Sequence, residues 1–350
     1  MQSYHFAAFV IASLTVLITT PIVRQLGLKF GRVDLPNDRK VHVQPMVRLG
    51  GISIFLGNLI ALLVVWQSGG FGRLPPQEEY QIWGITLGGL AFFLIGLADD
   101  FFNLSAFNRL ILQIGIATIV WNVGVQIEFL SLPGGGLIAL PAGISLMLTV
   151  LWLVGMCNAI NWIDGLDGLA AGVSGIAAVV MLLASLFMDQ PAAALVAAAL
   201  AGGTLAFLRY NFNPAQIFMG DGGSYYLGFT LAGVGVVGLV KGVTTVAVLL
   251  PYLILAVPLL DMSAVIIDRL RCGKSPFAAD KRHLHHRLLN AGLSHRFTVV
   301  FIYCLTLWVG SLALAMVGIP SGYIYAIVAT LLLSYTGWQA RRQAHRQANR

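Results

Sequence analysis

Long apolar stretches alternate with short polar links along this chain. An apolar run of about 17–25 residues is long enough to cross the hydrocarbon core of a bilayer as a helix, and such runs recur between residues 4 and 338. They predict about eleven transmembrane helices, at residues 4–27, 49–67, 82–98, 109–127, 137–157, 168–188, 192–210, 224–240, 243–267, 298–317 and 320–338. We therefore expect an all-α polytopic membrane protein.

The composition agrees with a membrane protein. Of the 350 residues, 58% are hydrophobic and 10% are charged, far below the roughly 25% of an average soluble domain. We interpret residues 1–338 as a single transmembrane domain and residues 339–350 as a basic cytosolic tail. The net charge of +7 would suggest a nucleic-acid partner in a soluble protein, but basic loops orient a membrane protein. The expected partner is the lipid bilayer, and no nucleic acid.

The basic residues predict the orientation. Cytosolic loops carry an excess of Lys and Arg, and of the 21 Lys and Arg only Arg73 and Lys241 fall away from one side of the eleven-span layout. That side includes the tail, so we expect the N-terminus outside and the C-terminus in the cytosol. The first apolar stretch has no basic segment before it and is too long for the core of a signal peptide, so we expect it to be retained.

The ninth span, 243–267, is unusual. It contains Pro251 and Pro258, and Asp261 lies before its end. Each proline removes a helix hydrogen bond and favours a kink. Two interpretations stay open, an ordinary kinked helix and a bend that shapes a groove for a lipid.

Five polar patches lie at the ends of the spans, and all five fall on the predicted cytosolic side. They are 34–42, Asp99 with Asp100, 158–168, 218–221 and 283–287. Charged side chains near a bilayer are costly and are usually functional. Carboxylates, amides, histidines and basic residues at one interface predict a site for a metal ion and a phosphorylated ligand.

Asp99 and Asp100 end the third span. Two adjacent carboxylates repel each other unless a cation or a basic residue offsets their charge, and Arg109 follows at the start of the next span. A solvated pair at a helix end is the alternative interpretation. The Asp-Asp-x-x-Asp box of prenyl diphosphate synthases is not met, because Asn103 occupies its last position.

The third patch is more specific. Asn158, Asn161, Asp164 and Asp167 follow one another at a spacing of three, so on a helix neighbours are about 60° apart and share a face, while the two ends diverge. Amides and carboxylates in this arrangement suit a metal, a nucleobase and a sugar. The alternative is a structural polar seam.

Phe218 and Asp221 lie at the opening of the eighth span. Glycines on both sides of Asp221 suit oxygen coordination of Mg²⁺, and backbone N–H groups at a helix start suit phosphate oxygens. Phe218 either stacks on a base or packs against a neighbouring helix.

The fifth patch is a dense cationic cluster. It combines His283, His285 and His286 with Lys281, Arg282 and Arg287. His-x-His-His alone is compatible with zinc, but no Cys or Glu is near and the flanking basic residues oppose a cation. An anion such as diphosphate fits the cluster better.

With these five patches in this order, the chain resembles the polyprenyl-phosphate N-acetylhexosamine-1-phosphate transferases. The resemblance runs from about Asp34 to Arg287, and the segment from Arg39 to Gly51 looks like the family's first cytosolic loop. It implies an eleven-span fold and a reaction of a UDP-N-acetyl-sugar with polyprenyl phosphate that gives polyprenyl-diphosphate-sugar and UMP. It further implies Mg²⁺ as cofactor, with Mn²⁺ as an alternative, and it allows a homodimer.

The resemblance also implies roles for individual residues. Asp221 would bind Mg²⁺, with Asp164 close to the metal. Phe218 would stack on uracil, while Asn161 and Asp167 would contact the nucleotide. Asp99 and Asp100 would face the lipid phosphate, and the three histidines would hold the diphosphate or the sugar. Further candidates for substrate binding are Lys40, His42, Arg109, Asn158 and Arg282.

Two departures point away from the family's phospho-N-acetylmuramoyl-pentapeptide transferase branch, which is the alternative function. Arg109 stands where that branch has a lysine, which keeps the charge but not a compact ammonium, and the fifth patch lacks three consecutive histidines. We therefore expect transfer of GlcNAc-1-phosphate from UDP-GlcNAc to undecaprenyl phosphate. The setting would be the cytosolic face of a bacterial plasma membrane, at the start of a cell-envelope polysaccharide.

Two other classes of protein compete with a transferase. A transporter would place its charges near the middle of the membrane in discontinuous helices, whereas these charges gather at one interface. An intramembrane aspartyl protease is suggested by Gly220-Asp221, but its partner Tyr-Asp dipeptide is absent. We therefore prefer the transferase.

Overall fold

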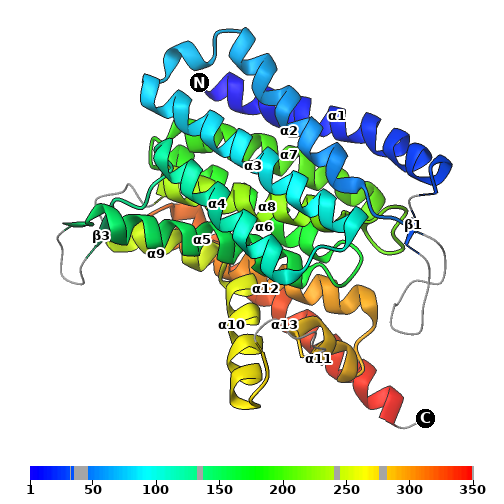
Figure 1. Ribbon diagram of the computed structural model, residues 1–350. Coiled ribbons are helices and arrows are strands. Elements are labelled where there is room, and N and C mark those ends of the chain that lie inside the picture. Colours follow the sequence, from blue (N-terminus) through cyan, green and yellow to red (C-terminus); the bar gives the residue numbers. More distant parts are fainter. Residues whose placement is uncertain (32, 35–45, 132–136, 240–244, 276–281, 349–350) are drawn as a thin grey trace.

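The computed structural model describes residues 1–31, 33–34, 46–131, 137–239, 245–275 and 282–348. Long helices lie side by side in a bundle, and two short β-hairpins lie at its opposite ends (Figure 1). The helices are α1 Gln2–Lys29, α2 Gly50–Gln67, α3 Pro76–Phe102, α4 Ala106–Asn122, α5 Ala142–Ile163, α6 Leu169–Phe187, α7 Pro191–Asn211, α8 Gly220–Val234, α9 Thr245–Ile254, α10 Ala256–Arg271, α11 Leu284–Asn290, α12 His295–Met316 and α13 Pro320–Ala348. The strands are β1 Val33–Asp34, β2 Met46–Val47, β3 Phe129–Ser131 and β4 Leu137–Ala139, and short 3₁₀ and π segments cover Phe71–Arg73 and Gly235–Leu239.

The helices confirm an all-α polytopic membrane protein. Within the described residues, seven helices are long and apolar enough to cross a membrane, namely α1, α2, α3, α5, α6, α7 and α12. The other predicted spans coincide with α4, with α8, with α9 and α10 together, and with α13. The number of eleven crossings and the orientation of the termini stay predictions.

The predicted start of the fifth span, at residue 137, is wrong. Leu137–Ala139 forms β4, which pairs antiparallel with β3, and α5 begins only at Ala142, after Pro141. A short apolar run is compatible with either a strand or a helix. Here the cross-strand hydrogen bonds take up the first residues of the run, and the helix starts behind the proline.

The predicted ninth span is broken into two helices. α9 ends at Ile254, α10 begins at Ala256, and Leu255 between them has non-helical dihedral angles (φ −100°, ψ 18°). A proline ring clashes with the carbonyl group four residues earlier, which for Pro258 is that of Ile254. The chain bends at this point, and α10 projects away from the bundle (Figure 1).

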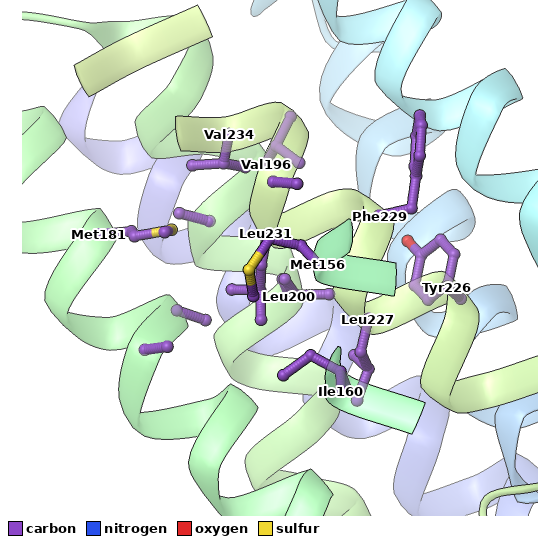
Figure 2. Packing of buried hydrophobic residues seen from close by; sticks show 14 of the residues in the cluster. Met156, Ile160, Met181, Val196, Leu200, Tyr226, Leu227, Phe229, Leu231 and Val234 are labelled. Atoms are coloured by element: carbon purple, nitrogen blue, oxygen red, sulfur yellow. The ribbon is translucent and has the colours of Figure 1, made fainter. Parts of the chain in front are cut away.

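Helix α8 lies at the centre of the bundle and packs against α2, α3, α5, α6 and α7. All of its residues except Asp221 are buried. Figure 2 shows Leu231 of α8 beside Met156 of α5 and Leu200 of α7, whereas Tyr226 and Phe229 lie on another side of the same helix. There Phe229 stacks on Phe92 of α3. An apolar helix that is buried on every side has a fixed position and orientation. The structure therefore holds the N-terminal end of α8, which carries Asp221, in a defined place.

Candidate active site

Helices α3 and α8 bring three carboxylates together. Asp99 and Asp100 lie in the last turn of α3, and Asp221 lies in the first turn of α8. The two backbones touch because Gly96 has no side chain: a Cβ atom there would collide with the carbonyl group of Asp221. The backbone N–H of Gly222 donates to Oδ2 of Asp100 at 3.2 Å, and the carboxyl groups of Asp99 and Asp221 interact. Two of the polar patches thus share one site.

Two arginines face these carboxylates. Arg109 of α4 forms an ion pair with Asp99, as its position next to the Asp pair suggested. Arg48, just before α2, places its guanidinium group 3.7 Å from Asp100 and 3.5 Å from Asp221. Sequence reasoning did not assign Arg48 to the site. The signal that could have found it is its place directly before the glycines that begin α2, within the loop that resembles the family's first cytosolic loop.

The third patch contributes Asn161 to the same cluster. Its Nδ2 donates to Oδ1 of Asp221 and to Oγ of Ser224, both at 2.9 Å. Asn158, one turn earlier on α5, turns instead to α4, where its Nδ2 donates to Oε1 of Gln113 at 2.8 Å. The predicted divergence along this run is therefore present. Gln113 and Ser224 are two further polar residues of the site that sequence reasoning missed.

The two carboxylates beyond α5 differ in their surroundings. Asp164 follows the last residue of the helix, and burial together with the nearby charge of Asp221 raises its pKa to about 7. Asp167 holds the turn after α7: its Oδ2 accepts from Nδ2 of Asn213 at 2.9 Å and from the N–H of Ala215 at 3.1 Å. Its own N–H donates to Nε2 of His295 at 3.0 Å. Asp164 thus belongs to the carboxylate cluster, whereas Asp167 connects loops beside it.

Phe218 is fixed by its backbone next to the start of α2. Its N–H donates to the carbonyl of Val47 at 2.8 Å, and its carbonyl accepts from the N–H of Gly50 at 2.9 Å. After these two hydrogen bonds, the positive φ of Gly220 (76°) turns the chain into α8. Phe218 and Arg48 therefore flank Asp221. Lys40, His42 and Lys281 lie outside the described residues.

The histidine segment opens α11, and Asp261 of α10 holds it. Nδ1 of His283 lies 2.8 Å from Oδ2 of Asp261. His285 is 2% exposed and lies against Gly165, where a Cβ atom would collide with its ring. Burial, with the imidazoles of His286 and His283 next, lowers the pKa of His285 to about 3. This ring is therefore neutral at pH 7.

The positive charge beside these rings comes from arginines. Arg282 and Arg287 are exposed, and Arg282 pairs with Asp268 of α10 at 2.8 Å. Within the described residues, no group of three or more His, Cys, Asp or Glu is already arranged to hold a metal, either at these histidines or at the carboxylates. The segment is a stack of imidazoles bordered by guanidinium groups.

Known proteins with related sequences decide the family. Residues 82–239 match the family model described as glycosyl transferase family 4. Over 338 residues, 95% of this chain and 86% of the relative, the sequence is 39% identical to a probable undecaprenyl-phosphate N-acetylglucosaminyl 1-phosphate transferase of Bacillus subtilis. The chain belongs to the polyprenyl-phosphate N-acetylhexosamine-1-phosphate transferases. This membership confirms the resemblance and sets aside the transporter and the protease.

Other members of the family match over most of their length. A decaprenyl-phosphate N-acetylglucosaminephosphotransferase of Mycolicibacterium smegmatis is 38% identical over 86% of this chain and 79% of the relative. An undecaprenyl-phosphate alpha-N-acetylglucosaminyl 1-phosphate transferase of Salmonella typhi is 30% identical over 89% and 82%. The acceptors in these names differ in prenyl length, whereas the sugar is the same.

The carboxylate cluster fits the divalent cation that this family membership implies. Four carboxylates, Asp99, Asp100, Asp164 and Asp221, face the guanidinium groups of Arg48 and Arg109, so two negative charges are left over when all four are ionised. Oδ1 of Asp100 is buried and accepts no hydrogen bond from the described residues. Mg²⁺ usually binds one or two carboxylates together with water and substrate phosphate oxygens. The site offers carboxylates without a closed cage of protein ligands, and this arrangement suits Mg²⁺ that also binds substrate phosphate.

Proposed function

We propose that this protein transfers GlcNAc-1-phosphate from UDP-GlcNAc to undecaprenyl phosphate and releases UMP, as the first step of a cell-envelope polysaccharide. The observation that carries the proposal is the cluster of Asp99, Asp100, Asn161 and Asp221 with two arginines at one end of an apolar bundle. A site for two phosphorylated substrates and a cation needs these residue types. The names of the relatives supply the sugar and the acceptor.

The chemical step requires little proton transfer. An oxygen of the polyprenyl phosphate attacks the phosphorus that carries the sugar, the bond from this phosphorus to the bridging oxygen breaks, and UMP leaves. A phosphate monoester has its second pKa at about 6, so the attacking oxygen is mostly deprotonated at cytosolic pH. The main barrier is the approach of two anions, which positive charge at the site lowers.

The residues of the cluster divide this work. Mg²⁺, when bound by Asp221 with Asp164 and Asp100, supplies charge that offsets the diphosphate. Arg109, which Asp99 holds at the end of α3, faces the phosphate of the lipid. Arg48 lies 3.5–3.7 Å from two of the carboxylates, so its guanidinium group is placed to pair with a substrate phosphate at the same site.

Other residues position the donor. Asn161 orients Asp221 through its hydrogen bond. Phe218, fixed by the ladder to the start of α2, stacks on uracil. Arg282, before α11, and Arg287, within it, attract the diphosphate, and the imidazoles between them hydrogen-bond to the diphosphate or the sugar.

The decisive experiment is UMP release by the purified protein. UDP-GlcNAc, UDP-GalNAc and UDP-MurNAc-pentapeptide are offered in turn with undecaprenyl or decaprenyl phosphate and Mg²⁺. We expect UMP and a lipid-linked sugar with UDP-GlcNAc and undecaprenyl phosphate. UMP release only with UDP-MurNAc-pentapeptide would favour the alternative branch, and no release with any donor would refute the function.

We further propose that the site faces the cytosol of a bacterial cell, with eleven crossings, the N-terminus outside and, as the family allows, two copies forming a homodimer. Nucleotide sugars are cytosolic, and the basic loops follow the rule for cytosolic segments. Cysteines introduced at positions 37 and 279 should react with a membrane-impermeant label only from the cytosolic side, and a cysteine at position 77 only from outside. Labelling of positions 37 and 279 from opposite sides would refute the topology.

A further inference from the structure

One carboxylate outside the cluster is tied to the histidine segment by both of its oxygens. Oδ2 of Asp261 lies 2.8 Å from Nδ1 of His283, and Oδ1 accepts the backbone N–H of Leu284 at 2.6 Å. Leu284 is the first residue of α11, where N–H groups have no partner within the helix. Asp261 therefore caps α11 from a different helix, α10, and fixes the ring that precedes it.

The ring held by Asp261 is part of a stack. His283 lies parallel to His285 (5.7 Å between centroids, 7° between planes), and His285 contacts His286 at 4.3 Å. On the other side, His283 meets Trp162 of α5 edge-on at 5.8 Å, and the guanidinium group of Arg269 lies over Trp162 at 4.9 Å. Trp162 follows Asn161 directly, so the stack joins the carboxylate cluster at α5.

This arrangement is buried, although its members are polar. Asp261 is 8% exposed and His283 is 7% exposed. A buried carboxylate is costly unless it is hydrogen-bonded, and the two bonds to α11 meet that requirement. By contrast Asp268, two turns further along α10, forms its pair with Arg282 in solvent, with half of its side chain exposed. The same helix thus offers one buried and one exposed link to the histidine segment.

The acceptor Asp261 also sets the tautomer of His283. A carboxylate can only accept a hydrogen bond, so Nδ1 of His283 carries the proton and Nε2 remains the atom available to a ligand. The hydrogen bond at one ring nitrogen decides what the other can do. Replacement of the carboxylate by an amide allows the opposite arrangement, in which Nδ1 accepts and Nε2 carries the proton.

We propose that Asp261 is a positioning residue of the transfer reaction: it orients His283 and the start of α11 so that the histidine segment meets the diphosphate or sugar of the donor. This inference rests on the proposed function. It also links the bent helix α10 to the donor site, because Asp261 lies one turn beyond Pro258, where the predicted ninth span breaks.

The test measures UMP release by the full-length protein with UDP-GlcNAc and undecaprenyl phosphate. We expect Asp261→Asn to lower kcat about ten-fold or more, which is about 1.4 kcal/mol of transition-state stabilisation, and to leave the KM for the lipid unchanged. Asp261→Glu, which keeps the carboxylate, should recover part of kcat. The control Asp189→Asn changes the same residue type in the exposed turn between α6 and α7 and should stay within two-fold of the unmodified protein.

A double-mutant cycle separates positioning from general destabilisation. If Asp261 acts through His283, Asp261→Asn combined with His283→Gln should be no slower than His283→Gln alone. Multiplying effects, an equal rise of both KM values, or a kcat of Asp261→Asn within two-fold of normal would each overturn the proposal. Should Asp261→Asn fail to fold, the same cycle is run with Asp261→Glu. Absence of UMP release by the unmodified protein would instead refute the proposed function, so the two failures are distinguishable.

Discussion

The buried imidazole of His285 predicts a specific loss of stability in acid. Its pKa is 6.5 in an unfolded chain and about 3 in the folded protein. Because the folded pKa is the lower one, the unfolded state binds the proton first, and stability that is fully present above pH 6.5 is lost as the pH falls toward 3. At pH 5, which is 1.5 units below the unfolded pKa, protonation of the unfolded state lowers the free energy of unfolding by about 2 kcal/mol.

Replacement of His285 by glutamine removes this proton site. The absolute stability of His285→Gln also changes because the ring packs against Gly165, so the informative quantity is the difference between two pH values. Apparent melting temperatures are measured in one detergent at pH 7.5 and pH 5. We expect the unmodified protein to lose several degrees more than His285→Gln between these values. His286→Gln, which alters the less buried neighbour on the same helix, should retain most of the loss, because burial is the largest cause of the lowered pKa of His285.

Equal losses in the unmodified protein and in His285→Gln would refute this reasoning. That result would mean that the ring is already protonated in the folded state, or that it is not buried. His285 would then be a cation available to the diphosphate.

Three further predictions concern the carboxylate cluster, the bent helix and the contact between α3 and α8. Asp221→Asn keeps the shape of the side chain but removes a charge that offsets a dication, so UMP release should fall roughly 10²–10⁴-fold and its Mg²⁺ titration should change. Asp99→Asn should slow turnover but leave nucleotide binding intact. An unchanged Mg²⁺ requirement in Asp221→Asn would refute the metal assignment. Leu260→Trp, on the exposed side of α10, should raise the KM for polyprenyl phosphate more than that for UDP-GlcNAc, and equal rises would argue against a lipid groove. Gly96→Ala should cost about 1–3 kcal/mol of stability, because its Cβ atom would collide with the backbone of α8. The control Gly115→Ala lies on the open side of α4 and should not lower stability. Equal melting temperatures of the two variants would contradict the contact between α3 and α8.

The sequence alone predicted most of the helices and the chemistry. A run of apolar residues in a bilayer has to satisfy its backbone hydrogen bonds internally, and a helix does so without any partner. Each predicted span therefore has a helical counterpart. The polar side chains that interrupt the runs were identified for the same local reason, since Asp99, Asn161 and Asp221 have no place in a lipid-facing helix.

The boundaries were less predictable where neighbours compete for the backbone. Leu137–Ala139 reads as apolar helix but pairs with β3, and that pairing partner is visible only in three dimensions. The prolines of the ninth span predicted a bend, whereas the angle at which α10 leaves the bundle depends on its packing against α5 and α12.

Only the tertiary structure decided which motifs meet and in what charge state. Gly96 lets α3 touch α8, so that carboxylates more than a hundred residues apart share one cluster. Arg48 reaches that cluster from the loop in which the sequence suggested only Lys40 and His42 as binding residues. His285 reads as a cation within a basic segment, yet burial makes it neutral. Local sequence determines whether a segment is apolar or polar. Distances between charges and their exclusion from water determine a site, and both depend on the packing of the whole chain.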